Sequence, residues 1–376
     1  MRNTSLRLQN FRNHMETNVE WAPHMNVIIG QNGAGKTNLI DALHYLCMSR
    51  SFVSNSDMYV VNQDATFFMI KGHFEGNIRS SFDVGCSYSR GEGKKIFVNE
   101  SPLDRLSDLI GMVPVVVLCP GDKKLTSEGP SERRSFIDSF ISQISPKYLQ
   151  DLLDFRKARK QRNKLLQEFR GRREVLEAYL EPWNVQLMEY GSRIVAKRTE
   201  VLNKFQDYLA REYEVISGMR HKPHLEYQTF CEPSDDEHLV HERYQAKLEE
   251  ELDHEIEREL TLIGPHRDEI VFYLDDFELR KYGSQGQHRL FALALKLAQL
   301  LYFSDELDDL PIFLLDDVFG DLDAQRTEVL LNALIEHAGQ TFVTAANPIP
   351  FDEYLTFDGE KNRKFSVANG NVEQLN

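Results

Sequence analysis

A glycine-rich segment near the start of the chain has residue types and spacing suited to phosphate chemistry. The segment consists of Gly30, Gln31, Asn32, Gly33, Ala34, Gly35, Lys36 and Thr37 and fits the pattern G-x-x-x-x-G-K-[ST]. Glycines in such a loop let backbone N–H groups turn toward the α- and β-phosphates. We expect Lys36 to reach the β- and γ-phosphates and the Thr37 hydroxyl to ligate Mg²⁺. The segment therefore predicts a nucleoside-triphosphate site.

Two adjacent carboxylates, Asp316 and Asp317, follow the apolar run 311–315. The run predicts a buried strand, and ligands bind at the carboxyl end of strands in open α/β sheets. Asp316 is expected to hold Mg²⁺ directly or through water. Asp317 is expected to orient or deprotonate the water that attacks the γ-phosphate. The alternative interpretation is a pair of solvated loop acids.

The elements that would position these residues follow from apolar periodicity. The β-branched run Val27–Ile29 predicts a strand before the glycine loop, and apolar positions within 39–47 recur at helical spacing after it. Residues 3–11 predict a strand to which 18–21 pairs back. Short strands within 58–98 predict an antiparallel meander beside the loop.

The pattern becomes helical from Ser131 onward, with a break expected at Glu181–Pro182. Heptads of the length that a rod requires are absent, which favours a compact helical lobe over a long coiled coil. The other expected elements are strands at 113–118, 225–230, 311–315 and 341–345, helices at 241–260, 287–303 and 324–337, and a hairpin of 270–274 with 277–282.

This order of elements predicts an α/β protein whose nucleotide-binding domain is built from both ends of the chain. The helical lobe is inserted in its middle. We expect residues 1–125 to form the first part of the domain, with the phosphate-binding loop. Residues 126–260 form the lobe, and residues 261–376 form the second part, with the acidic pair.

The composition is that of a soluble globular protein, with 376 residues, 41% hydrophobic and 27% charged. No apolar run approaches the ~20 residues of a membrane span, and the N-terminus has no apolar signal-peptide core. We therefore expect a cytoplasmic protein with no membrane partner. Four scattered cysteines without a C-x-x-C pair argue against a disulfide framework or a zinc site.

The net charge of −15 is not typical of a nucleic-acid-binding protein, because phosphates are neutralised by Lys and Arg. The charge is unevenly distributed, however. Residues 156–173 form a strongly basic run, which is compatible with a local DNA-binding face. A solvated helix face explains the same run.

Residues 283–287 precede the Leu- and Ala-rich helix and resemble the signature motif of the ATP-binding-cassette superfamily. Ser284 and Gly286 at a helix N-terminus can hydrogen-bond a γ-phosphate. We include Gln287 among the expected nucleotide-binding residues. In that superfamily the motif acts across a dimer, so the resemblance implies a catalytic role for Ser284 beside Lys36 and Asp317. Residues 320–323 resemble the loop that follows the acidic pair there.

Further runs, outside these general ATPase motifs, are similar to the RecF family over nearly the whole chain. They are Leu8–Asn13, Ser49–Phe52, Gly129–Asp138, Gln161–Leu166 and Gly264–Asp268. The resemblance implies an ATPase head like that of the ATP-binding-cassette superfamily. Such a head has a mixed sheet with helices, an antiparallel β subdomain and an inserted compact α-helical lobe.

The family resemblance also implies a function. Such a protein binds ATP with Mg²⁺, binds DNA, dimerises head to head when ATP is bound, and hydrolyses ATP weakly with stimulation by DNA. It acts in recombinational repair and replication-fork maintenance, at single-strand gaps and stalled forks. Its partners are RecR and RecO, with which it helps to load the recombinase. Its DNA substrates contain single-stranded and double-stranded regions.

Two departures from the superfamily pattern concern the site. Thr344-Ala345-Ala346 stands where many such ATPases have a histidine, which is consistent with weak hydrolysis. The segment 118–122 contains no glutamine where the related loop has one. Arg12 and Asn13 are expected to contact nucleotide, because the N-terminal strands lie beside the phosphate loop in relatives. A surface turn is the alternative for these two residues.

Charged residues of the family runs have alternative roles. For Arg133 and Arg134, pairing with Asp138 at helical spacing competes with a phosphate contact. His266 and Arg267 could be interface or hairpin-capping groups, and neither is expected to be catalytic.

Two other functions remain open. The first is the ATPase head of an overcoming-lysogenization-type nuclease, which would require a further domain of clustered acids after Asp323. The chain has little room for such a domain. The second is a structural ATPase that does not bind DNA, which the net charge of −15 favours.

Overall fold

The computed structural model describes residues 1–376 except 169–172, 219–220, 338, 347–350 and 376. The chain forms two compact units. Unit 1 comprises Met1–Asp122, Val215–Gly218 and Leu293–Asn376, and unit 2 comprises Lys123–Glu214 and Met219–Ala292. Both ends of the chain therefore belong to unit 1.

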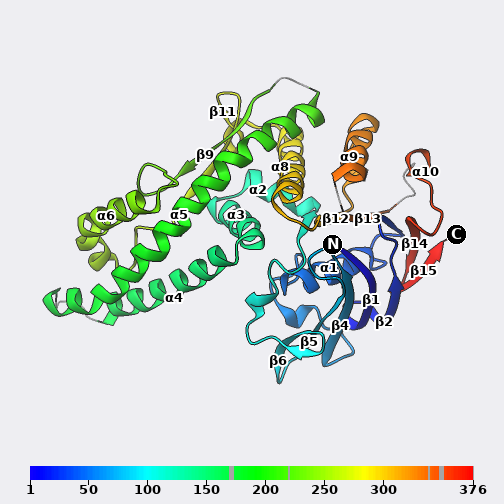
Figure 1. Ribbon diagram of the computed structural model, residues 1–376, viewed down its shortest axis with the longest axis horizontal. Coiled ribbons are helices and arrows are strands. Elements are labelled where there is room, and N and C mark those ends of the chain that lie inside the picture. Colours follow the sequence, from blue (N-terminus) through cyan, green and yellow to red (C-terminus); the bar gives the residue numbers. More distant parts are fainter. Residues whose placement is uncertain (169–172, 219–220, 338, 347–350, 376) are drawn as a thin grey trace. The chain divides into compact units, whose positions relative to one another are not determined.

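The first sheet of unit 1 is antiparallel, with the strand order β2-β1-β4-β5-β6-β7 (Figure 1). Its strands are β1 (Arg2–Phe11), β2 (His14–Glu20), β4 (Phe67–Glu75), β5 (Phe82–Ser89), β6 (Gly93–Val98) and β7 (Ser101–Pro102). Leu6 and Leu8 alternate with outward residues of β1 and are buried, as a strand with one face on the core requires. The predicted N-terminal pair of strands and the meander are confirmed.

The second sheet of unit 1 is mixed, with the order β15-β14-β3-β13-β12-β8. Its strands are β3 (Met25–Ile29), β8 (Val115–Leu118), β12 (Ile312–Asp316), β13 (Gln340–Ala345), β14 (Asn362–Ala368) and β15 (Asn371–Leu375). Strand β3 pairs in parallel with both β13 and β14, so the two ends of the chain form one sheet. The hairpin of β14 and β15 was not expected from the sequence.

Helix α1 (Lys36–Met48) connects the two sheets of unit 1, because it contacts both β4 and β12. It is buried along almost its whole length and ends at Ser49, whose left-handed φ of 55° lets its N–H donate to the Tyr45 carbonyl. The other helices of unit 1 are α9 (Ala324–His337), α10 (Phe351–Tyr354) and the part of α8 (Gln285–Glu306) from Leu293 onward. Single turns lie at Asp57–Tyr59, Leu106–Leu109, Pro120–Asp122 and Phe319–Asp321.

Unit 2 is mainly helical, as predicted. Its helices are α2 (Lys123–Ser127), α3 (Pro130–Ile144), α4 (Pro146–Glu168), α5 (Arg173–Ser217, in this unit to Glu214), α6 (Glu237–Arg258), α7 (Leu279–Tyr282) and the first part of α8 (Gln285–Glu306). Helix α6 begins where the Asp236 carboxylate accepts hydrogen bonds from two first-turn N–H groups.

The predicted break at Glu181–Pro182 is wrong, because α5 continues through Pro182. Proline removes one helical N–H donor and crowds the preceding turn. Here buried leucines hold the helix on either side of the proline. Leu176 and Leu180 pack with Leu166 of α4, and Leu187 is also fully buried. Tertiary packing therefore outweighs the local cost.

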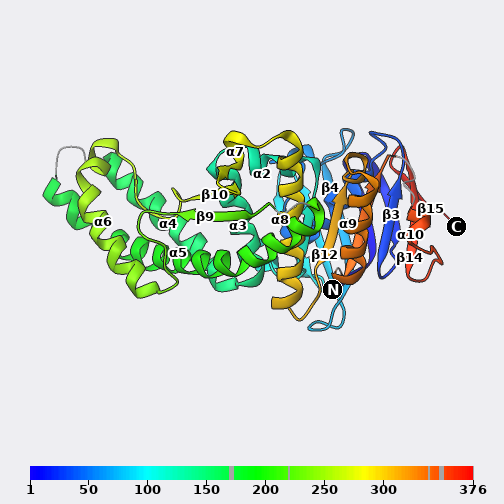
Figure 2. The ribbon, with the colours of Figure 1, turned by 90° about the horizontal axis from the view of Figure 1, so that it is seen from above.

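A small antiparallel sheet of unit 2 has the order β11-β10-β9, and Figure 2 shows β9 and β10 among the helices of this unit. Its strands are β9 (Pro223–Gln228), β10 (Glu269–Leu274) and β11 (Phe277–Glu278). The predicted hairpin is confirmed in its first strand and its turn. Its second strand is shorter than expected, because residues 279–282 form the helical turn α7.

The compact units place residues 261–292 with the helical lobe, since β10 pairs with β9. The expected division into 1–125, 126–260 and 261–376 stays a prediction about domains. In the described part of the chain, no helix is long and apolar enough to cross a membrane.

Candidate functional site

The loop Gly30–Thr37 connects β3 to α1 in unit 1, as the pattern predicts. Gly35 precedes α1 with a φ of 116°, and a Cβ there would lie 2.7 Å from side-chain atoms of Asn13. At Gly30 a Cβ would lie 2.3 Å from the Val367 carbonyl oxygen of β14. Glycine is therefore required at both positions. Backbone conformation requires it at Gly35, and the close approach of β14 requires it at Gly30.

Lys36 spans the base of this loop. Its Nζ donates hydrogen bonds to the carbonyl oxygens of Gly30, at 2.8 Å, and Gln31, at 3.0 Å. The residue is 6% exposed, so its ammonium group is held beside the loop amides. A cation fixed in this way is suited to bind phosphate oxygens.

Thr37, Asp316 and Thr344 form one hydrogen-bonded cluster at the start of α1. The Thr37 hydroxyl donates to the Asp316 carboxylate, with Oγ1 2.8 and 3.0 Å from its two oxygens. The Thr344 hydroxyl donates to Asp316 Oδ1 at 2.7 Å and accepts from the Asp317 N–H at 2.9 Å. The structure thus brings Thr37 and Asp316 together from opposite ends of the chain.

Burial raises the pKa of the Asp316 carboxyl, and the hydrogen bonds from Thr344 and Thr37 offset part of that effect. Such a carboxylate is a buried charge that a cation would stabilise. Mg²⁺ prefers hard oxygen ligands and usually takes only one or two from the protein. The Thr37 hydroxyl and the Asp316 carboxylate fit that requirement. The adjacent Asp317 is exposed, with a left-handed φ of 51°.

Replacing Thr344 with valine is expected to raise the pKa of Asp316 further, because it removes one of the bonds that lower it. Protonated Asp316 cannot ligate Mg²⁺. As the pH falls, the variant should therefore lose Mg²⁺-dependent binding of a nucleoside triphosphate at a higher pH than wild type does. Calorimetric titrations from about pH 8 to about pH 5, with and without Mg²⁺, measure this.

The control is Thr341→Val, which changes another buried threonine of β13 whose side chain does not bond Asp316. Its pH profile should match that of wild type. Superimposable profiles for Thr344→Val and wild type would show that Asp316 does not hold the metal.

The turn after β1 lies against the loop and α1. The Arg12 guanidinium pairs with the buried Asp41 carboxylate of α1 at 2.8 Å and also donates to Ser51 Oγ at 3.0 Å. Asn13 Nδ2 donates to the Ala34 carbonyl at 2.9 Å. These contacts place both residues beside the phosphate loop. Their contact with nucleotide stays a prediction.

Sequence reasoning missed two supports of the loop. His14 of β2 is fully buried, and its Nε2 lies 3.1 Å from the Gly35 carbonyl. Burial lowers the pKa of His14, which favours the neutral ring. The Gly370 N–H, from the turn between β14 and β15, donates to the Ala34 carbonyl at 3.0 Å. No local pattern marks either residue, because both partners are distant along the chain.

The signature-like residues lie in unit 2, at the start of α8. Ser284 N–H donates to Gln287 Oε1 at 2.8 Å, and Gln287 N–H donates to Ser284 Oγ at 3.2 Å. This reciprocal pair is a capping box, so Ser284 has a structural role in starting the helix. Ser284 and Gly286 are exposed.

In the segment 118–122, which contains no glutamine, the Asp122 carboxylate forms the stabilising contacts. Asp122 Oδ2 accepts from the Cys119 N–H at 2.8 Å, and Asp122 Oδ1 pairs with Lys296 at 3.0 Å. Both contacts lie within unit 1. Asp122 therefore orders the turn at 119–122.

Pairing of Arg133 and Arg134 with Asp138 is wrong. Arg133 is buried and forms a two-pronged ion pair with Glu269 of β10, at 2.8 and 2.9 Å. Arg134 donates to the Asp268 carbonyl at 2.6 Å. Asp138 instead accepts from Arg198 at 2.7 Å, so a residue distant along the chain displaces the helical neighbours.

Comparison with known proteins is consistent with this geometry. Residues 4–354 match the family model described as RecF/RecN/SMC N terminal domain. The DNA replication and repair protein RecF of Salinibacter ruber is 44% identical over 371 residues, covering 97% of this chain and 90% of that protein. The protein of the same name from Chloroherpeton thalassium is 39% identical, covering 93% and 95%.

Two solved structures are similar over the whole chain. One is described as the recombination mediator protein RecF-ATPrS in the RecFOR pathway, with a TM-score of 0.87, 30% identity and coverage of 100% and 98%. The other is its RecF-ATP counterpart, with a TM-score of 0.89, 29% identity and coverage of 100% and 97%. An SMC head, at 12% identity and a TM-score of 0.56, shares the fold. The predicted ATPase-head fold is thereby confirmed.

Proposed function

The chain belongs to the RecF family, and on that premise we propose that it is an ATP-dependent DNA-binding protein of recombinational repair and replication-fork maintenance. The observation that carries the proposal is that one unit contains both the loop bonded by Lys36 and the hydrogen-bonded cluster of Thr37, Asp316 and Thr344. The solved RecF-ATP relative supports ATP as the nucleotide.

Each part of this site has a proposed role. The amides of residues 30–35 and the Lys36 ammonium bind the phosphates, and Arg12 and Asn13 contact the nucleotide; the bonds of Arg12 to α1 and of Asn13 to Ala34 support this role. Thr37 and Asp316 hold Mg²⁺, which would neutralise charge on the β- and γ-phosphates. Asp317, exposed at the end of β12, orients the attacking water.

The proposed assembly is an ATP-dependent homodimer. Ser284, Gly286 and Gln287 of one copy bind the γ-phosphate held by the loop of the other. One observation supports this: the capping box presents an exposed helix N-terminus, and such termini in general bind phosphate groups. ATP then stabilises the dimer, and weak, DNA-stimulated hydrolysis releases it.

We further propose that the dimer acts in the cytoplasm at gapped DNA, where single and double strands meet, with RecO and RecR as protein partners. The RecFOR pathway named for the solved relatives supports these partners. The net charge of −15 requires that DNA contact be confined to basic parts of the surface. Residues 156–168 of α4 supply one such stretch; residues 169–172 of the basic run lie outside the described residues.

A variant at Ser284 tests the function directly. Ser284→Asp keeps an N-cap acceptor but places a negative charge where the partner's γ-phosphate would bind. Like charges at an interface cost several kcal/mol, so the ATP-dependent dimer should weaken by about tenfold or more. Light scattering with a slowly hydrolysed ATP analogue measures dimerisation, and calorimetry should show monomer ATP affinity within about twofold of wild type. Equal loss of monomer affinity would contradict a role across the dimer.

The same samples test the DNA function. Wild type should bind gapped DNA more tightly with ATP than without it, and this binding should weaken steeply with salt. Ser284→Asp should lose the ATP-dependent part, and Ser284→Asn, which keeps the cap without the charge, is the matched control. If binding to gapped DNA depended neither on ATP nor on salt concentration, a structural ATPase would be favoured. Metal-dependent DNA cleavage by the pure protein would favour a nuclease.

A further inference from the structure

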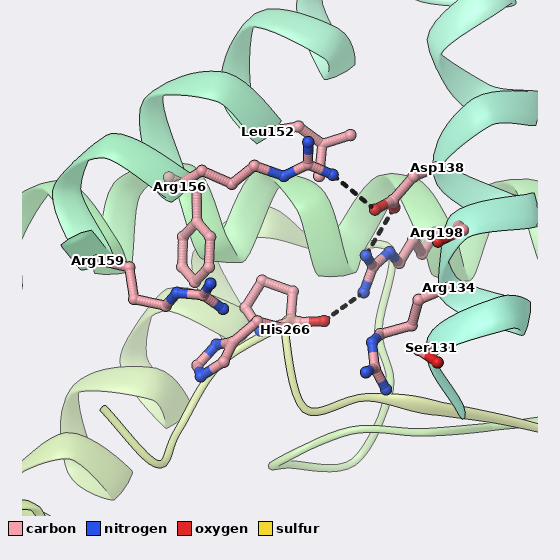
Figure 3. A pocket seen from close by; sticks show the side chains of 11 residues that line it. Ser131, Arg134, Asp138, Leu152, Arg156, Arg159, Arg198 and His266 are labelled. Atoms are coloured by element: carbon pink, nitrogen blue, oxygen red, sulfur yellow. Dashed lines mark hydrogen bonds and ion pairs between the residues drawn. The ribbon is translucent and has the colours of Figure 1, made fainter. Parts of the chain in front are cut away.

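Unit 2 contains two adjoining cavities, of about 230 and about 450 Å³, whose linings share Arg134, Arg159 and His266. We call them together the arginine cavity. Arg134 comes from α3, Arg159 from α4 and His266 from the segment before β10. Figure 3 shows Arg159 and His266 beside each other, with Arg134 on the other side of the space. Three separate elements therefore direct cationic or imidazole groups into one hollow.

Positive charge exceeds negative charge in this cavity. Its arginines are Arg134, Arg156, Arg159, Arg198 and Arg267. Asp138 is the only carboxylate among the described residues that line it. A hollow with several guanidinium groups and one carboxylate is suited to an anion.

The Asp138 and Asp268 carboxylates form ion pairs with two of these arginines, Arg198 and Arg156. Arg198 pairs with Asp138 at 2.7 Å and with the buried Asp268 at 2.6 Å. Arg156 lies 3.6 Å from the same Asp138, and Figure 3 shows both guanidinium groups directed at it. Arg134 donates to the main-chain carbonyl of Asp268 and forms no ion pair with a carboxylate in the part of the chain that the structure describes.

Arg159 and Arg267 have no carboxylate partner among the described residues. Burial lowers the pKa of Arg159, and the positive charges of Arg156 and Arg267 lower it further. The same kind of environment acts on His266, whose pKa is lowered to about 3 by burial and then by Arg159. Positive charges thus destabilise one another at this cavity, and the carboxylates near Arg134, which are Asp268, Glu269 and Asp138, offset only part of this effect.

Two further groups face the same space with unused hydrogen-bonding capacity. Helix α3 begins at Pro130 without a side-chain cap, and Pro130 and Ser131 line the cavity, so the positive end of this 15-residue helix points there. His266 Nε2 bonds the Thr261 carbonyl at 3.1 Å, while its Nδ1 is buried and has no hydrogen-bond partner among the described residues. A bound anion would supply acceptors for the unpaired N–H groups of this helix end.

We propose that the arginine cavity is a second phosphate-binding site, separate from the ATP loop, that holds a phosphate group between Arg134, Arg159 and Arg267. Phosphate is favoured over a carboxylate because donors converge from three elements, and a tetrahedral oxyanion presents oxygens in three directions whereas a carboxylate is planar. The phosphate group can belong to a small anion or to a nucleic-acid strand. The two sources share this chemistry and are separated by the test below.

The test uses pyrophosphate and the full-length protein with its ATP loop filled by a slowly hydrolysed ATP analogue. Wild type should bind pyrophosphate under these conditions in calorimetry. Arg159→Met should weaken this binding by about tenfold or more, since it removes charged hydrogen bonds to the anion. Lys160→Met is the matched control: it removes the same charge from the next, exposed residue of α4, outside the cavity lining. It should change the affinity by less than about twofold.

Both variants are first checked for wild-type ATP affinity and thermal unfolding, and Arg267→Met provides a second, exposed substitution in the same cavity. Competition then identifies the source of the phosphate. Displacement of pyrophosphate by gapped DNA assigns the site to a strand phosphate, and lack of displacement assigns it to a small anion. Absence of pyrophosphate binding by wild type, or equal weakening by Arg159→Met and Lys160→Met, would overturn the proposal. Neither result would affect the proposed ATP function, because the ATP loop is filled throughout.

Discussion

Lys36→Met should lower the affinity for ATP by about tenfold to a hundredfold, because hydrogen bonds to charged groups contribute on the order of 1.5–3 kcal/mol. The Lys36 ammonium is nearly buried and is fixed by the carbonyls of Gly30 and Gln31. Its position is therefore set before nucleotide binds. Methionine retains most of the aliphatic stem, so the variant removes the charge with little change in packing. Calorimetry with a slowly hydrolysed analogue measures the loss.

The matched control is Lys95→Met, which removes an exposed lysine of β6 in the same unit. Its ATP affinity should equal that of wild type, and circular dichroism should show both variants folded. The dimer provides a second readout. If light scattering gave the same ATP-induced dimer for Lys36→Met and wild type, ATP binding at this loop would not control dimerisation.

Arg162→Met should lower the free energy of unfolding of unit 2 by about 3–5 kcal/mol, the usual cost of removing one partner of a buried ion pair. The side chains of Arg162 and Glu255 are both 0% exposed and lie 2.5 Å apart. Arg162 also donates to Asn184 and Thr261, and Glu255 also accepts from the Leu262 N–H. The variant leaves the Glu255 carboxylate buried without its cation.

Urea unfolding followed by tryptophan fluorescence measures this loss. The chain has two tryptophans, and Trp183 lies in α5 beside Asn184, so it reports on unit 2. Lys164→Met, which removes an exposed pair with Glu168 on the same helix, should cost less than about 1 kcal/mol. The double variant Arg162→Met with Glu255→Met should recover part of the stability, since it leaves no unpaired charge. A loss below about 1 kcal/mol for Arg162→Met alone would contradict this account.

The features that the sequence predicted well are those with a local pattern. The loop at 30–37, its strand and its helix follow one another without a break, and each has its own periodicity. The run 311–315 with its two acids is equally local. Strands β3 and β13 pair in parallel. Parallel strands are joined by crossover connections, so strands that are distant along the chain can be neighbours in one sheet.

The features that were missed depend on contacts between distant residues. Pro182 is a helix breaker by its own chemistry, and only the packing around Leu176 and Leu180 explains why α5 continues. Asp138 has suitable arginines four and five residues away, yet Arg198 occupies it. Such side-chain partners depend on how the helices pack together, so spacing along one helix cannot identify them.

The functional residues divide in the same way. Lys36, Thr37 and Asp316 were predicted from motifs, and the structure brings them into one unit. Thr344 was noted only as a departure from a histidine, whereas its hydroxyl connects Asp316 to the Asp317 amide. The role of His14 could not be read from β2, because its partner is the main-chain carbonyl of Gly35, and main-chain partners leave no trace in sequence.

The position of β3 between β13 and β14 has a consequence for synthesis of the protein on the ribosome. The phosphate loop emerges long before β13 and β14, the strands on both sides of β3. The Gly370 amide that bonds the loop follows later still. The nascent chain therefore carries an unpaired β3 until β13 and β14 have been made, and pairing across so many residues is slow. The nucleotide site is completed only after β13, β14 and the turn at Gly370 have emerged, so a product that stops before them would lack it.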